Sequence, residues 1–162
     1  MNSKQLLKFL MLGAAVWLLA GCGPTGDRCR KCGMVVDDHP RWVAGLIDER
    51  GVEERFCSPR CMFAHWRSPA GAAGKDAWVT EYYTQQRLPV PEVYFVMGSD
   101  VMGPMGRALV PVAGQAAAEG FLQDHRGTRI LSPEEITAEL LREVASGVTP
   151  DSATPTDIED LH

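Results

Sequence analysis

Four of the five cysteines in the chain form two close pairs, Cys29 with Cys32 and Cys57 with Cys61. This clustering is more typical of metal or redox sites than of disulfides that join distant loops. If both pairs bind one ion, the fold has to bring the two segments together, and the site has four sulfur ligands, as structural zinc sites do. Two disulfides, a thioredoxin-like redox pair and small buried side chains are the alternatives.

The fifth cysteine, Cys22, ends a segment with the layout of a bacterial lipoprotein signal peptide. A basic start and the short apolar run 9–20 lead to Leu-Ala-Gly-Cys, which resembles the lipobox at which a cysteine is acylated. The run is shorter than the ~20 residues that span a bilayer. We therefore expect residues 1–21 to be removed and Cys22 to carry lipid, palmitate included, on the periplasmic side. Glycine at position 23, rather than aspartate, favours the outer membrane.

The rest of the chain suits one small domain. We expect a short tether at 22–28, a folded domain at 29–145 and a disordered acidic tail at 146–162, where acids and prolines replace residues that could pack. The formal net charge of −5 argues against nucleic acid as a partner.

Short strand-like segments separated by turn signals predict two similar β-β-α-β units, hence an α+β fold with mainly antiparallel sheet. A terminal helix should follow, begun by a capping box between Ser132 and Glu135. One irregular sheet without a repeat is the alternative. The expected strands are 41–48, 52–56 and 77–83 in the first unit and 92–97, 107–112 and 128–131 in the second, with helices at 58–68 and 115–124.

Methionines accompany the cysteines at two places. Met34 follows Cys32 and a glycine, and Met102 and Met105 stand in a glycine-rich segment between two predicted strands. Thiolates and thioethers are soft ligands that select Cu(I), and positive charge at Arg30 and Lys31 would lower the pKa of nearby thiols. His39, His65 and His125 are isolated from these motifs, and no arrangement of residues suggests an enzyme.

Together the motifs resemble the NosL family of lipoprotein copper chaperones, and the likeness covers most of the mature chain. It rests on the lipobox and on six segments of the domain: Cys32-Gly-Met34, Phe56-Cys-Ser58, Tyr94-Phe-Val-Met-Gly-Ser99, Gly103-Pro-Met-Gly106, Val110-Pro-Val112 and Ala117-Ala118-Glu119 with Phe121. The piece around Cys57 and Cys61 is also similar to cysteine-rich TRASH domains.

The resemblance implies a Cu(I)-binding metallochaperone with Cys32, Met34 and Met105 as metal ligands. Its implied partners are nitrous oxide reductase and the ABC-type maturation complex of that enzyme, and its implied fold is two β-β-α-β units. This sequence departs from some members by adding three cysteines, and the secondary candidates for the metal shell are Cys29, Cys57, Cys61 and Met102. The alternatives are a zinc- or disulfide-stabilised interaction lipoprotein and a thiol enzyme similar to organomercurial lyase.

Overall fold

The computed structural model describes residues 26–146. The predicted signal peptide, the predicted lipid attachment at Cys22 and nearly all of the predicted tail lie outside these residues. Within them, no helix is both long enough and apolar enough to cross a membrane.

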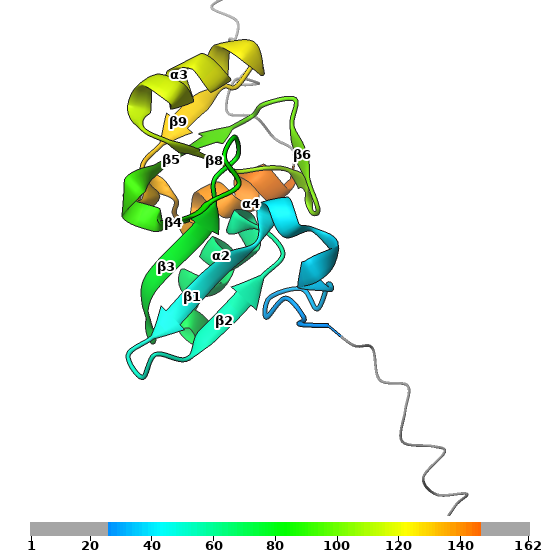
Figure 1. Ribbon diagram of the computed structural model, residues 1–162, viewed down its shortest axis with the longest axis vertical. Helices are drawn as coiled ribbons and strands as arrows, with labels where there is room; N and C mark the ends of the chain where they lie inside the picture. Colours follow the sequence, from blue (N-terminus) through cyan, green and yellow to red (C-terminus); the bar gives the residue numbers. More distant parts are fainter. Residues whose placement is uncertain (1–25, 147–162) are drawn as a thin grey trace, which may run out of the picture.

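The first unit is a four-stranded antiparallel sheet with one helix (Figure 1). Its strand order is β2-β1-β3-β4. The turn between β1 and β2 forms because the carboxylate of Asp48 accepts the backbone N–H groups of Arg50 and Val52. The elements are β1 (Ala44–Asp48), β2 (Glu53–Phe56), α2 (Pro59–Trp66), β3 (Gly74–Thr80) and β4 (Arg87–Pro89), with 3-10 turns at Val36–Asp38, Pro40–Trp42 and Pro69–Gly71.

The second unit repeats the topology of the first, so the predicted β-β-α-β repeat is confirmed. Its order β8-β5-β9 places the first strand between the other two, as β1 lies between β2 and β3. A small hairpin, β6 with β7, is inserted between β5 and β8. The elements are η4 (Val90–Glu92), β5 (Val93–Met97), β6 (Met102–Gly103), β7 (Gly106–Arg107), β8 (Val110–Ala113), α3 (Gln115–Asp124) and β9 (Arg129–Leu131).

Four predicted boundaries were wrong. The strand predicted at 107–112 covers only Val110–Ala113, because Gly106 and Arg107 pair with β6 in the small hairpin. The first strand begins at Ala44 rather than at 41, because Pro40 opens a 3-10 turn. The third strand is shifted to 74–80. The capping box of Ser132 and Glu135 closes only the 3-10 turn η5 (Pro133–Glu135), after which the backbone of Ile136 leaves the helical region, so α4 runs over Ala138–Ser146.

The two units share one core. In Figure 1 the second unit lies above the first, with α4 between them in this view. Phe63 of α2 and Phe95 of β5 are fully buried, and their rings meet edge to face with centroids 5.1 Å apart. Arg67 donates to the carbonyl oxygens of Pro133 and Ile136, which fixes the start of the terminal segment on α2. The helix that carries Cys61 is therefore held by both units.

A buried carboxylate closes the turn after β3 and makes stability depend on pH. Glu81 is 2% exposed, and its Oε2 accepts the N–H and the hydroxyl of Thr84 at 2.6 and 2.7 Å. Burial opposes ionisation, but these and neighbouring hydrogen bonds outweigh it, so the pKa of Glu81 lies below its ordinary value of 4.5. A lowered pKa contributes stability above the unfolded value, which is lost as the pH falls through the folded value.

We expect Glu81→Gln to lower the free energy of unfolding at pH 7 by about 1–3 kcal/mol, the usual range for hydrogen bonds to a buried charged group. The deficit should shrink as the pH falls below about 4.5, because the carboxylate of the unfolded wild-type chain then binds a proton that folding has to release. Urea unfolding at pH 7 and pH 3.5 measures both values. Glu49→Gln, on an exposed turn, is the control, and an equal pH slope in both variants would contradict the assignment.

Candidate metal centre

The first cysteine pair is held in a tight backbone loop. The N–H of Cys29 donates to the carbonyl of Met34 at 2.7 Å, and the N–H of Gly33 donates back to the carbonyl of Cys29 at 2.8 Å. Gly33 has a φ of +78°, a conformation that side chains disfavour, which explains the glycine after Cys32. Both thiols therefore belong to one short loop, residues 29–34, which we call the knuckle.

The second pair is positioned by the start of α2. Ser58 is the N-cap, as the sequence predicts: its hydroxyl accepts the N–H of Cys61 at 3.2 Å, and Pro59 occupies the first helical position. Cys57 directly follows β2, and Cys61 lies in the first helical turn. The cap thus fixes the spacing between the two sulfurs.

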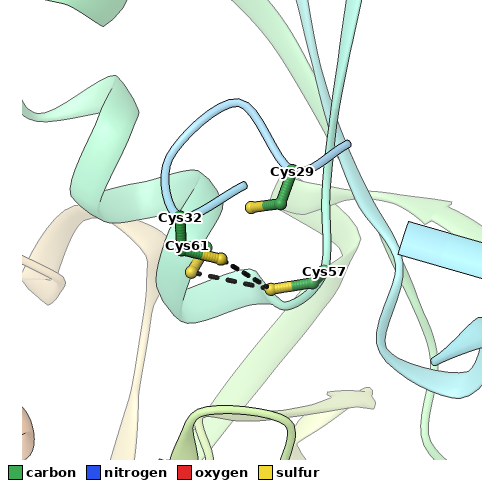
Figure 2. Close-up of side chains that lie close together, drawn as sticks. All are labelled: Cys29, Cys32, Cys57 and Cys61. Carbon is green, nitrogen blue, oxygen red and sulfur yellow. Dashed lines mark hydrogen bonds between the residues drawn. The ribbon is translucent and has the colours of Figure 1, made fainter. Parts of the chain in front are cut away.

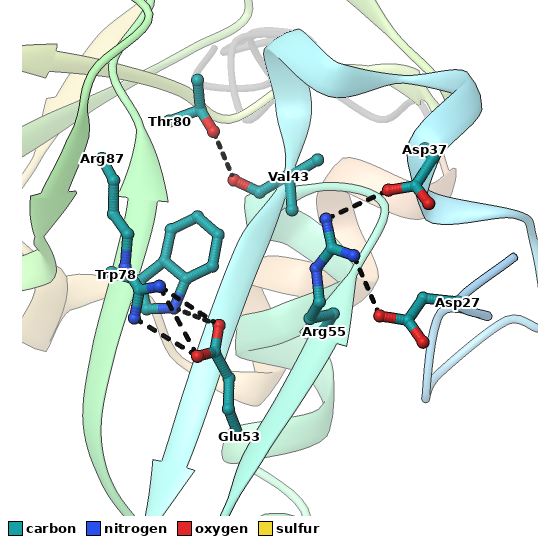
Figure 3. Close-up of polar contacts among 8 residues, drawn as sticks. All are labelled: Asp27, Asp37, Val43, Glu53, Arg55, Trp78, Thr80 and Arg87. Carbon is teal, nitrogen blue, oxygen red and sulfur yellow. Dashed lines mark hydrogen bonds and ion pairs between the residues drawn. The ribbon is translucent and has the colours of Figure 1, made fainter.

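A guanidinium joins the knuckle to the first sheet. Arg55 on β2 forms ion pairs with Asp27, before the knuckle, at 2.9 Å and with Asp37, after it, at 3.1 Å (Figure 3). The carbonyl of Arg55 also accepts the N–H of Arg30. Both flanks of the first cysteine pair are thereby attached to the strand that leads into Cys57.

These supports bring the four thiols together (Figure 2). Their sulfur atoms all lie within 4.8 Å of one another, with 3.5 Å between Cys32 and Cys57 and 3.7 Å between Cys57 and Cys61. A disulfide needs about 2.05 Å, and all four cysteines of residues 26–146 are free. Four sulfurs bound tetrahedrally to one ion at about 2.3 Å lie about 3.8 Å apart. The spacing is that of a thiolate metal site, and the disulfide alternative does not describe this structure.

The thiols differ in exposure and in proton affinity. Cys29, Cys57 and Cys61 are buried, whereas Cys32 is exposed. A hydrogen bond from Cys61, assisted by backbone N–H groups, lowers the pKa of Cys29 to about 4, and the same bond raises the pKa of Cys61. Burial, with the hydrogen bond to Cys32, raises the pKa of Cys57 to about 12. The metal-free cluster therefore favours one thiolate that accepts hydrogen bonds from neighbouring thiols. A bound cation would displace the protons of those thiols.

The prediction that the positive charge of Arg30 lowers the pKa of nearby thiols was wrong. Its side chain turns to Glu54 at 3.0 Å, and the low pKa of Cys29 comes from hydrogen bonds rather than from a neighbouring cation. Backbone N–H groups can stabilise a thiolate as a charge does.

A cleft of about 450 Å³ opens beside the cluster and includes the exposed thiol. Cys32, Cys61 and Met105 share its wall. Met105 stands at the tip of the β6–β7 turn, where Arg60 of α2 donates to its carbonyl at 2.9 Å. The other residues of the wall are Lys31, Arg60, Ala64, Arg67, Ser68, Ala138, Leu141, Arg142 and Ala145.

The remaining predicted ligands have different surroundings. Met34 is half-buried and packs against the main core, and its carbonyl closes the knuckle. Met102, on β6, is 63% exposed and is not part of the cleft wall. Neither His65, which faces Glu54 at 3.1 Å, nor His125, which faces Asp100 at 3.0 Å, belongs to the thiol cluster.

Known proteins share both the sequence pattern and the fold. The sequence model of the NosL family matches residues 24–141. The copper-binding lipoprotein NosL of Stutzerimonas stutzeri is 30% identical over 130 residues, covering 74% of this chain and 67% of that protein. The crystal structure of the copper chaperone NosL from Shewanella denitrificans has the same fold, with a TM-score of 0.65 and 22% identity, over 74% of this chain and 96% of that chain.

Proposed function

The chain belongs to the NosL family, and from that premise we propose that it is a lipid-anchored copper carrier. It binds the ion as Cu(I) and transfers it by exchange of thiolate and thioether ligands. Copper is its cargo rather than a cofactor for a reaction, so the protein is a carrier and not an enzyme.

The convergence of four free thiols beside a methionine-bearing cleft is the observation that carries this proposal. Sulfur ligands of both kinds favour Cu(I) over hard cations. Cys32 is the exposed member, so it is the first thiolate that an incoming ion meets, and Met105 is the thioether on the same cleft wall. A thioether has no proton to release and no charge, which suits a ligand that must give the ion up again.

The family resemblance supplies the proposed partners. Nitrous oxide reductase, or its ABC-type maturation complex, receives the copper. Lipid on Cys22 holds the carrier at the periplasmic face of the outer membrane, and the short tether keeps its thiols close to that membrane.

The spacing of the sulfurs also favours a second candidate, a zinc ion that stabilises the domain. A closed tetrahedron of four thiolates is the usual structural zinc site. The two candidates differ in their demand for thioether: zinc with four thiolates leaves no role for Met105, whereas Cu(I) exchange gives it one.

We therefore expect Met105→Leu to weaken Cu(I) binding about 10–100-fold, the usual cost of losing a supporting group at a metal site. Met102→Leu, on the same hairpin but outside the cleft wall, should bind as the parent does. Titration of the reduced protein against a chromophoric Cu(I) chelator measures both affinities. Equal affinities for the two variants, or bound zinc that resists Cu(I), would favour the zinc-stabilised domain instead.

A further inference from the structure

The four thiols differ in their access to other molecules. Among the cysteines of residues 26–146, Cys32 alone is exposed, and the other three are at most 5% exposed. Thiol–disulfide exchange requires that a thiolate reach a sulfur atom of the reacting molecule, so access decides which cysteine reacts first. An external disulfide or dithiol must therefore exchange with Cys32.

Cys57 is the thiol placed to continue such a reaction. Its sulfur lies 3.5 Å from that of Cys32, and Figure 2 shows the two side chains converging from separate segments. A disulfide between them needs about 2.05 Å, so the sulfurs have to approach by about 1.5 Å. Cys57 is fully buried, whereas residues 30–33 of the knuckle are all exposed. The knuckle can therefore make this small movement without disturbing the core.

The surroundings of Cys32 are basic although the chain as a whole is acidic. The formal net charge is −5, but no carboxylate lines the cleft that includes Cys32. The cations of its wall come from the knuckle, α2 and α4, and they are Lys31, Arg60, Arg67 and Arg142. Molecules that carry carboxylates should be drawn to this basic cleft.

The contacts of these cations leave most of their charge in place. Arg60 donates to the carbonyls of Met105 and Arg107, and Arg67 donates to the carbonyls that precede α4. Carbonyl oxygens accept hydrogen bonds without cancelling the charge. Arg142 pairs with Glu139 at 3.5 Å, but both side chains are more than three-quarters exposed, so this ion pair is weak.

We propose that Cys32 and Cys57 form a redox pair that exchanges with small disulfides and dithiols bearing carboxylates. The thiolate of Cys32 attacks one sulfur of the external disulfide and expels the other sulfur as a thiolate. The sulfur of Cys57 then attacks that of Cys32, which closes the internal disulfide and expels the second external thiolate. Two protein thiols are oxidised and one external disulfide is reduced to two thiols, which take up the two protons. An anionic dithiol reverses both steps.

The internal disulfide would remove two of the four thiolates from the cluster. Only the reduced protein could then bind a metal ion through all four sulfurs. The assignment of the pair depends on the positions and the exposure of the sulfurs, not on the identity of the ion. Exchange can therefore hold or fail independently of the proposed copper transport.

The pair is tested on the reduced, metal-free mature chain with dithiodipropionate, a disulfide that carries two carboxylates. Mass spectrometry of the product should find Cys32 linked to Cys57, with Cys29 and Cys61 still free. Cys57→Ala should stop at the mixed disulfide on Cys32. Cys32→Ser should lose the reaction while the protein is folded, because the remaining thiols are buried. Circular dichroism checks that both variants fold.

The map of the parent protein decides the assignment even if a variant fails to fold. A linkage between Cys29 and Cys32 would overturn the role of Cys57. A mixed disulfide that persisted in the parent protein would overturn the second step, and an unreactive parent would overturn the pair.

The role of the cleft is tested by comparing dithiodipropionate with the uncharged hydroxyethyl disulfide. Each rate constant is divided by that of the same disulfide with N-acetylcysteinamide, an uncharged thiol, which removes the intrinsic reactivity. At low salt the corrected ratio should favour the anionic disulfide about tenfold, the lower end of electrostatic steering. About 0.5 M salt should abolish most of this preference.

Substitution of the cations completes this test. Lys31→Gln combined with Arg142→Gln should remove most of the preference, whereas Lys75→Gln, at an exposed site outside the cleft wall, should keep it. A change in the reactivity of Cys32 itself would alter both rates and leave their ratio constant. No preference in the parent protein, or an unchanged preference in the double variant, would overturn the basic cleft as the site that selects the reacting molecule.

Discussion

Replacing Cys57 by serine should reduce the Cu(I) affinity of the reduced protein more than about 100-fold. Loss of even an indirect partner costs about 10–100-fold at metal sites, and a direct thiolate should cost more. Cys57 is fully buried, and its sulfur lies 3.5 Å from that of Cys32 and 3.7 Å from that of Cys61, so it links the exposed thiol to the buried ones. Competition against a chromophoric Cu(I) chelator gives the affinity.

Cys57→Ala makes the comparison sharper. Serine leaves a buried hydroxyl, whereas alanine removes the sulfur without adding a polar group. Both variants should lose copper affinity equally if the thiolate is a ligand. If Cys57→Ala bound copper like the parent and only its metal-free stability changed, the buried cysteines would be core residues, and the metal shell would reduce to Cys32 with the methionines.

The repeated fold was predictable because its signals are local. Short runs of apolar residues bounded by turn signals mark the strands, and Ser58-Pro59 specifies the start of α2 by hydrogen bonding and by a fixed φ. The errors arose where a local signal has two outcomes. Ser132 and Glu135 form the expected capping box, but the box closes a 3-10 turn, and the helix does not continue because the backbone of the buried Ile136 is not helical.

The site was only partly predictable. The sequence identifies each thiol and suggests that the pairs meet, but their meeting depends on contacts between distant segments, such as Arg55 with Asp27 and Asp37. The basic cleft was missed altogether. Arg60 in α2 and Arg67, the C-cap residue of α2, lie seven positions apart and flank Ala64, a spacing that places residues on one helix face. That face looks solvent-exposed until α4 and the β6–β7 turn are placed beside it.

Phe63→Ala should have the largest effect on stability, lowering the free energy of unfolding by about 3–5 kcal/mol, as Phe to Ala changes in cores do. Phe63 is fully buried, meets Phe95 of the second unit edge to face, and stacks on Trp66 with centroids 5.9 Å apart. Denaturant unfolding of the metal-free protein measures the change. Val52→Ala, at a side chain 53% exposed, should stay within about 0.5 kcal/mol.

The same substitution tests whether the metal centre depends on the junction between the units. Phe63 belongs to α2 with Cys61, and the β5 strand that it contacts precedes the hairpin that carries Met105. A cavity at Phe63 should therefore loosen α2 against the second unit and weaken Cu(I) binding, although no ligand has changed. Phe63→Leu fills most of the space and should recover much of both losses. If stability fell by several kcal/mol while copper affinity stayed constant, the thiol cluster would be held by the first unit alone.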